Sequence, residues 1–437
     1  MPRGEVGPAA GDDTISAHAE RGEATVLNAP PVYSVLPFVA MLLAIAVGPL
    51  WVPHWWESNR NKFFVSAVLG LPVLAAYGVH HPGALLHTAE DYVSFIVLLA
   101  GLFVISGGIL LRGDLVATPA TNTAFLALGG LMASFVGTTG ASMLLVRPLL
   151  QTNSERTHVK HTLVFFIFVV SNVGGMLTPL GDPPLFLGYL AGVPFTWTFR
   201  LWPQWGLMLL ALLVLYFVYD SLQFAREPLA AIRRDRARVE PLRVRGGLNA
   251  VWLVGVVLGV AFLHAPWREA TIAALAAVSL KLTPSRIRRD NGFSAGPMVE
   301  VTVLFAGIFL TMIPALDLLR LRGDQLGVRT PWQFFWVTGV LSSFLDNAPT
   351  YLTFLALGQG LRLPGEIVGV PAEILAAISV GAVAMGANTY IGNAPNFMVK
   401  AIAEEAGVKM PSFFGYMLYS GAILLPLFVL VTLVFFR

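Results

Sequence analysis

Long apolar runs fill most of the chain from residue 31 onward, and short polar segments separate them. A helix needs about 20 apolar residues to cross the hydrocarbon core of a bilayer. The runs are continuous, whereas membrane strands alternate between apolar and polar positions. We therefore predict spanning helices at 33–52, 62–80, 91–111, 160–193, 204–222, 248–265, 267–281, 297–316, 372–400 and 412–436.

Two further apolar segments, 123–150 and 333–360, are interrupted near their middle. The first contains the sequence GTTG at 137–140, and the second contains DNAP at 346–349. A break at membrane depth leaves backbone groups unpaired unless protein or water satisfies them. We predict that each segment is a re-entrant hairpin that enters and leaves on one side. The alternative is one more continuous span at either position.

The composition fits a helical membrane protein and excludes several other classes. The 437 residues are 56% hydrophobic and 12% charged, and their mean hydropathy is +0.71, whereas a soluble domain carries about 25% charged residues. The net charge of +3 does not indicate a nucleic-acid partner. Without cysteine, the chain has no disulfide, thiolate metal site or thiol catalysis. It also lacks the ATP-binding motif GxxxxGK[ST] and the zinc motif HExxH.

Polar segments mark the beginning and the middle of the chain. Residues 1–30 are rich in glycine and alanine, lack the apolar core of a signal peptide, and are expected to be a disordered tail. Residues 223–247 hold seven arginines and three acids, so the positive-inside rule places this linker in the cytoplasm and both termini outside. The expected divisions are the tail 1–30, a first repeat 31–222, the linker 223–247 and a second repeat 248–437.

The two halves of the chain resemble each other. At a constant offset, Gly175, Thr178, Leu180, Gly181, Pro184 and Phe186 recur as Gly386, Thr389, Ile391, Gly392, Pro395 and Phe397. Five predicted spans per half require the second copy to be inverted. Inverted repeats with discontinuous helices are typical of secondary transporters, whose binding sites lie near the bilayer midplane. Chance similarity between apolar helices is the alternative, and the matched glycine, proline and threonine positions argue against it.

Four short segments, 137–142, 171–184, 342–350 and 388–396, hold most of the polar residues at membrane depth. Their glycines and prolines unwind a helix, which frees carbonyl oxygens for a small cation and exposes half-helix N-termini that attract anions. Threonine and asparagine add neutral oxygens. The pattern suits a sodium ion, an anion, or both.

Asp182 and Asp346 favour a cation. A carboxylate at the bilayer centre costs about 2.5–3.5 kcal/mol on insertion scales, so it normally faces a wet cavity and serves a function. A carboxylate that holds either a proton or a sodium ion is sufficient for antiport. For Asp182, which precedes Pro183, the alternative is an N-cap of a half-helix.

Four other residues are weaker candidates. Glu300 lies one turn inside a predicted span and is either an additional proton site or an interfacial residue. His158 and His161 titrate in the physiological range and are candidate pH sensors, although simple solvation at the membrane interface is the favoured interpretation. Arg147 follows the first hairpin and is predicted to contact lipid phosphate, with anion binding as the alternative.

The sequences SNVGGMLTPLGDPP at 171–184, SSFLDNAP at 342–349 and TYIGNAPNFM at 389–398 resemble those of NhaD-type sodium/proton antiporters. These belong to an ion transporter superfamily that also holds citrate, arsenite and dicarboxylate/sodium carriers. The resemblance implies an all-α polytopic fold of two inverted five-span halves, each with a re-entrant hairpin and an unwound helix. It further implies elevator-like alternating access and, by analogy, a homodimer.

The resemblance also implies a set of ion ligands at the hairpin tips and the unwound helices. The expected cation- and proton-binding side chains are Thr138, Thr139, Asn172, Thr178, Asp182, Asp346, Asn347, Thr389 and Asn393. The expected backbone or hairpin-tip positions are Gly137, Gly181, Ala348 and Gly392. The tips read Gly-Thr-Thr and Asp-Asn-Ala where dicarboxylate carriers have Ser-Asn-Thr, and this departure favours a cation.

The leading hypothesis is a sodium/proton antiporter of the bacterial inner membrane, not an enzyme, with the sodium ion and the proton as cargo. We expect no cofactor, membrane lipids as surroundings and no nucleic acid. The first alternative is a sodium- or proton-coupled carrier of citrate or arsenite. The second is a non-transporting membrane scaffold or an intramembrane enzyme. The membrane serines have no evident His or Lys partner, which argues against an enzyme.

Overall fold

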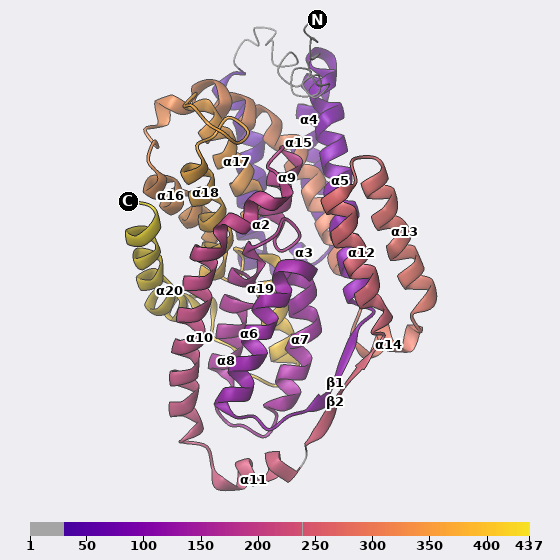
Figure 1. Ribbon diagram of the computed structural model, residues 1–437. Coiled ribbons are helices and arrows are strands. Elements are labelled where there is room, and N and C mark those ends of the chain that lie inside the picture. Colours follow the sequence, from indigo (N-terminus) through magenta and orange to yellow (C-terminus); the bar gives the residue numbers. More distant parts are fainter. Residues whose placement is uncertain (1–29, 238) are drawn as a thin grey trace, which may run out of the picture.

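The structure, a computed structural model, describes residues 30–237 and 239–437 and is built almost entirely of helices (Figure 1). The predicted tail, apart from residue 30, and Arg238 of the linker lie outside the described residues. Within the described residues, seven helical stretches are long and apolar enough to cross a membrane, namely Val32–Trp51, Asn59–His80, Pro82–Ser106, Pro119–Val136, Phe195–Phe224, Gly296–Leu326 and Phe413–Phe435. The protein is therefore an all-α, multi-pass membrane protein.

Most of the predicted spans correspond to single helices. The long ones are α2 (Leu36–Trp51), α4 (Asn59–His80), α5 (Pro82–Ser106), α10 (Trp202–Phe224), α15 (Gly296–Arg322) and α20 (Phe413–Phe435). The helix α5 starts at Pro82, whereas the predicted span starts at residue 91, because the helix continues through polar residues that precede the apolar run. The predicted spans 248–265 and 267–281 form α12 (Leu248–Phe262) and α13 (Trp267–Leu282), which have only 15 and 16 residues.

Both interrupted segments form pairs of helices that are broken where the sequence predicts. The first pair is α6 (Pro119–Val136) and α7 (Thr138–Thr152), and the second is α16 (Pro331–Phe344) and α17 (Asn347–Gly360). Gly137 joins the first pair with a φ of 81°, a left-handed conformation that glycine adopts readily. In Figure 1 the first pair occupies the lower half of the molecule and the second pair the upper half.

Two other helices are unwound at the same depth. The first is divided into α8 (Lys160–Val169), the short 3-10 helix η2 (Val173–Met176) and α9 (Pro183–Leu190). The second is divided into α18 (Ala372–Met385), the 3-10 helix η5 (Gly386–Asn388) and α19 (Ala394–Glu405). α8 and α19 lie in the lower half of Figure 1, while α9 and α18 lie in the upper half, so the two broken helices run in opposite directions.

Matching residues of the two halves make matching contacts. The Thr178 hydroxyl donates to the carbonyl of Ser134, and the Thr389 hydroxyl donates to the carbonyl of Ser343. In each half the same serine also donates its hydroxyl to the backbone of the unwound helix. These equivalent bonds tie each hairpin to its broken helix and support the interpretation of the chain as two repeats.

We expect Gly392→Ala to destabilise this packing. A Cβ atom at residue 392 would lie 2.6 Å from the Gly386 carbonyl oxygen and 2.7 Å from that of Ser342, and neither backbone can retreat easily. Overpacking of this kind costs about 1–3 kcal/mol, which should lower the melting temperature of the purified protein in detergent. The control is Gly206→Ala, since a Cβ there meets nothing within 4 Å. Equal melting temperatures of the two variants would contradict the tight crossing.

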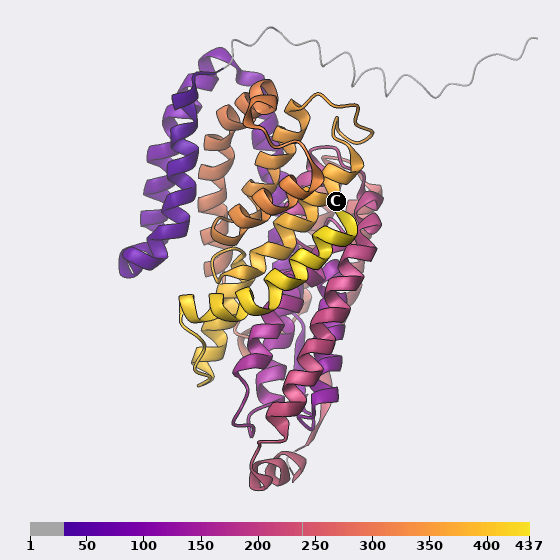
Figure 2. The same cartoon turned by 90° about the vertical axis from the view of Figure 1, so that its left-hand side faces the viewer.

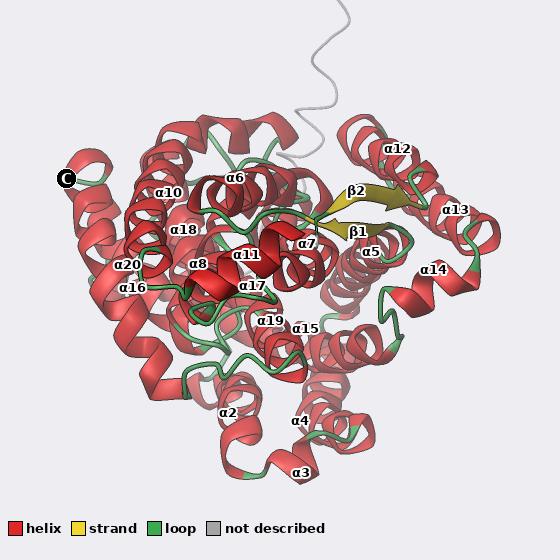
Figure 3. Cartoon of the chain, turned by 90° about the horizontal axis from the view of Figure 1, so that it is seen from below, coloured by secondary structure: helices red, strands yellow, loops and turns green. Residues whose placement is uncertain are grey.

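The linker is more structured than its composition indicates. It contains α11 (Leu229–Ala237) and strand β2 (Glu240–Arg245), which pairs antiparallel with β1 (Leu110–Asp114) in a sheet that the sequence did not predict. The Asp235 carboxylate accepts a bond from the backbone N–H of Ala117 at 3.1 Å, which ties the linker to the start of the first hairpin. Figure 3 shows α11 and the sheet at this end of the molecule.

The broken helices occupy the core, and other helices surround them. Side chains of α8 and α18 are almost entirely buried, whereas α4, α10 and α20 expose large apolar side chains such as Phe63, Leu210 and Leu418. The helices α2, α4, α5 and α15 pack beside one another on one flank (Figure 2). Short helices complete the described chain, namely η1 (Val32–Val35), α3 (Pro53–Trp56), η3 (Phe195–Leu201), α14 (Ser285–Asp290) and η4 (Gly323–Leu326).

Candidate functional site

Asp182 lies at the meeting point of both hairpins and both broken helices. It precedes α9, and only 1% of its surface is exposed. Its carboxylate accepts a hydrogen bond of 2.8 Å from the hydroxyl of Thr138, the first residue of α7. It accepts a second, of 2.6 Å, from the side-chain amide of Asn347, the first residue of α17. It accepts a third, of 3.1 Å, from the side-chain amide of Asn393, which precedes α19. One carboxylate therefore holds four segments that are far apart in the sequence.

The two aspartates have different local roles. Asp182 occupies the N-cap position of α9, yet its side chain makes no capping hydrogen bond there. Asp346 is the side chain that caps a helix, because it accepts the backbone N–H of Ala348 at 3.0 Å at the start of α17. Capping therefore does not account for the buried carboxylate of Asp182.

A chain of asparagines connects the two broken helices beside Asp182. The Asn393 amide also donates to the side-chain oxygen of Asn172 at 3.2 Å and to the carbonyl of Ser171 at 3.1 Å. The amide of Asn172 donates in turn to the side-chain oxygen of Asn396 at 2.7 Å. Asn396 completes the chain by donating to the carbonyl of Thr389 at 2.9 Å. The cluster is thus rich in neutral oxygens and nitrogens supplied by both halves.

The described residues give the Asp182 carboxylate no fixed counter-charge. Within the described residues, no Lys, Arg or His forms an ion pair with Asp182, and its three side-chain partners are all neutral. A buried carboxylate is costly unless it is protonated or paired with a cation. Carboxylate and carbonyl oxygens suit hard cations, and the described residues hold no group of three His, Cys, Asp or Glu that could bind a metal.

Other predicted residues lie at or near the cluster without a side-chain hydrogen bond to Asp182. Gly181 accepts the backbone N–H of Thr138 at 2.8 Å, and Gly137 caps the start of α7. The remaining predicted positions also lie around these breaks. Thr139 follows Thr138, and the hydroxyls of Thr178 and Thr389 donate to the carbonyls of Ser134 and Ser343. The N–H of Ala348 donates to Asp346, and Gly392 packs closely on the backbone of Gly386.

Glu300 does not join the cluster. Its carboxylate forms an ion pair of 2.7 Å with the buried Lys62, which links α15 to α4. His158 and His161 also lie elsewhere, at the start of α8, and their role as pH sensors stays a prediction.

Ser134 and Asn396 belong to the network but were not among the predicted site residues. Ser134 could have been found from the repeat, since Ser343 matches it and both follow the same bonding pattern. Asn396 lies three residues after Asn393 on the same half-helix, and its bond to Asn172 connects segments that only the folded chain brings together.

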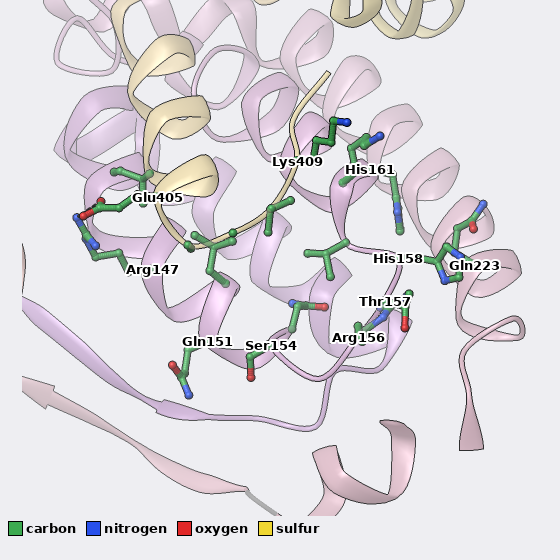
Figure 4. A pocket seen from close by; sticks show the side chains of 18 of the residues that line it. Arg147, Gln151, Ser154, Arg156, Thr157, His158, His161, Gln223, Glu405 and Lys409 are labelled. Atoms are coloured by element: carbon green, nitrogen blue, oxygen red, sulfur yellow. Dashed lines mark ion pairs between the residues drawn. The ribbon is translucent and has the colours of Figure 1, made fainter. Parts of the chain in front are cut away.

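A second polar region lies at the lower end of the molecule, where the ends of α7, α8, α10 and α19 surround a cavity of about 870 Å³ (Figure 4). Arg147, His158 and His161 line it. Its wall contains a buried ionic cluster in which Asp220 accepts from Arg156 at 2.7 and 3.0 Å and contacts the His161 ring at 2.7 Å.

Glu227 completes that cluster from the linker. It accepts the backbone N–H groups of Thr157 at 2.9 Å and His158 at 2.8 Å. Burial alone would raise the pKa of Glu227, but these two bonds and the Arg156 charge outweigh it and hold the pKa below its ordinary value. The Glu227 carboxylate thereby connects the linker to the segment just before α8 through hydrogen bonds and an ion pair.

Comparison with known proteins adds one finding. A protein-family model described as "Putative citrate transport" matches residues 27–436, which is nearly the whole chain. No curated protein matches the sequence.

Proposed function

The chain belongs to this citrate transport family, and from that premise we propose that it is a secondary active transporter whose central cation site is Asp182. The proposed leading form is sodium/proton antiport, as the resemblance to NhaD-type antiporters implies. The observation that carries it is the buried carboxylate that both hairpin tips contact, with neutral partners only. A family of transporters also agrees with the expectation that the chain is not an enzyme.

Exchange at Asp182 follows from competition for one charge. When a proton is bound, the carboxyl group is neutral and can remain buried between Thr138, Asn347 and Asn393. When the proton leaves, a sodium ion restores neutrality, and threonine, asparagine and carbonyl oxygens complete its coordination. Because proton and sodium compensate the same charge, each excludes the other. The further proposed ligands are Thr139, Asn172, Thr178, Asp346 and Thr389, with Gly137, Gly181, Ala348 and Gly392 at the backbone.

In the proposed mechanism, movement of the two hairpins provides alternating access to Asp182. Thr138 belongs to the lower hairpin and Asn347 to the upper one, and both close on the same carboxylate. Displacement of one hairpin relative to the other elements would expose Asp182 to one side of the membrane. The inverted repeat proposed from the sequence is supported by the opposite directions of the two broken helices. The arginine-rich linker supports a cytoplasmic orientation of the lower side, and the proposed membrane is the bacterial inner membrane.

The second candidate is a cation-coupled carrier of a citrate-like anion. The family description favours it. In that mechanism Asp182 holds the coupling ion, while the N-termini of the half-helices α9 and α19 attract the anion. The two candidates share the cation site and differ in whether an anion must accompany it.

Solid-supported-membrane electrophysiology distinguishes the two functions. Concentration jumps of sodium, lithium or citrate would be applied to reconstituted protein at two pH values. Antiport predicts pH-dependent transient currents on sodium or lithium jumps without citrate. Because one-for-one exchange at a single carboxylate moves no net charge, it also predicts a change of internal pH in proteoliposomes under the same jumps. A coupled carrier predicts signals only when citrate is present. Protein that gives neither a current nor a pH change in any jump would contradict both.

Asp346→Asn tests the charge at the upper hairpin tip separately from its structural role. Asparagine caps helices about as well as aspartate, so the bond to the Ala348 N–H is retained and the fold should survive. We expect the sodium concentration for half-maximal current to rise at least about tenfold, equivalent to about 1.4 kcal/mol of binding free energy. The measurement is the same sodium jump series on both proteins. An unchanged half-maximal concentration would remove Asp346 from the cation site.

A further inference from the structure

The cavity at the lower end is separate from the Asp182 cluster. It lies between the C-terminal ends of α7 and α10, the start of α8 and the loop after α19 (Figure 4). None of the residues that bond to Asp182 lines it. Its volume of about 870 Å³ falls in the range of sites for small organic molecules and far exceeds the space that one ion requires.

The charges that face this cavity are predominantly positive. Glu405 is the only acidic residue in its lining, and it is paired with Arg147 at 3.6 Å. Arg156 is buried and engaged with Asp220, and His158 contacts Glu227. Two exposed lysines of the lining, Lys160 and Lys409, appear in none of the ion pairs formed by residues 30–237 and 239–437. Their positive charge is therefore available to a ligand.

The start of α8 adds to the positive potential. This ten-residue helix begins at Lys160, no side chain caps its N-terminus, and its first turn contains no acid. Val159, Lys160 and His161 all line the cavity. The first N–H groups of a helix and its dipole favour negative charge at such a position.

Neutral polar groups complete the lining. Gln151, Ser154 and Gln223 can each donate hydrogen bonds to oxygen atoms, and Figure 4 places them along the floor and one side of the cavity. A single small anion would leave most of this space unused. An organic anion with several carboxylates could reach Lys160, Lys409 and the neutral donors together.

We propose that this cavity is a binding site for a small polycarboxylate, held between Lys160 of α8 and Lys409 after α19. The bound anion ties together the lower halves of both broken helices and so stabilises the conformation seen here. The site is distinct from Asp182 and does not depend on which cargo Asp182 carries.

Calorimetric titration of the purified protein in a neutral detergent at low salt tests the proposal, with citrate and inorganic phosphate as probes. We expect citrate to bind more tightly than phosphate. We also expect the Lys160→Gln/Lys409→Gln double variant to weaken citrate binding at least about tenfold, because it removes two positive charges that attract the carboxylates at close range. The charge-matched control is Lys281→Gln/Arg286→Gln, whose residues are exposed and lie outside the cavity. The control should bind citrate as the unchanged protein does.

Asp182→Asn separates this site from the central one. Citrate binding that survives this substitution but is lost in the double lysine variant supports the proposal, even if no cation exchange is ever detected. Citrate binding that is lost with Asp182→Asn and kept in the double variant would overturn it, as would the absence of citrate binding. A final titration adds phosphatidylglycerol to delipidated protein. If the cavity binds this lipid and does not bind citrate, it is a lipid site and the proposal is wrong.

Discussion

Asp182→Asn is expected to abolish cation exchange. The substitution keeps the size and shape of the side chain but removes the carboxylate that, in the proposed mechanism, exchanges a proton for a sodium ion at the centre of the cluster. In proteoliposomes with an imposed proton gradient, sodium addition should dissipate the gradient with the unchanged protein. With the variant, dissipation should fall to the rate of protein-free liposomes.

The fold of this variant should persist, which makes the test interpretable. An asparagine oxygen can still accept from one or two of the three donors, while its amide group faces another donor and loses that bond. The cost of one unmade buried bond is about 1–3 kcal/mol, and removal of an unpaired buried charge offsets part of it. The melting temperature and elution volume of the variant should therefore stay close to those of the unchanged protein.

The matched control is Asp324→Asn, in which the same chemical change is made on an exposed residue of η4. It should exchange sodium for protons at the normal rate. Normal exchange by a well-folded Asp182→Asn protein would instead show that the buried carboxylate is not the site of competition, and the proposed mechanism would be wrong.

The elements set by local sequence could be predicted from the chain alone. Apolar length identified the long helices, and glycine or proline at membrane depth identified the breaks at Gly137 and Asp346, because unwinding depends on the residues at that point. The linker was less predictable, since β2 forms only by pairing with β1, which lies more than a hundred residues away.

The structure brings several of the predicted polar residues together around Asp182, in an arrangement that the sequence did not predict. The sequence indicated both Asp346 and Asp182 and suggested capping as the alternative for Asp182. The structure gives the capping role to Asp346 and the contacts between halves to Asp182. Which carboxylate occupies the centre depends on how the hairpins pack against the broken helices. Such long-range packing leaves no local signal in the sequence.

The buried ionic cluster near the cavity should be essential for stability. Arg156 lies between two carboxylates, with 2.7 Å to Asp220 and 3.7 Å to Glu227, and all three side chains are almost fully buried. Arg156→Met removes the guanidinium charge that both acids share. Loss of one member of a buried ion pair costs about 3–5 kcal/mol, so we expect a clear fall in melting temperature in detergent at pH 7. The control, Arg286→Met on an exposed arginine, should melt normally.

A second substitution separates charge from packing in this cluster. Arg156→Met/Asp220→Asn removes the cation and one of the acids, so the double variant should recover part of the lost stability if uncompensated charge is the cause. The pH matters because the pKa of Glu227 is lowered in the folded protein. Its contribution is present above the pKa of the unfolded chain and is lost as the pH falls through the folded value. The deficit of Arg156→Met should therefore shrink on acidification, since a protonated Glu227 no longer needs a cation. If the double variant melted lower by the sum of the two single effects, packing rather than charge would hold the start of α8 to α10.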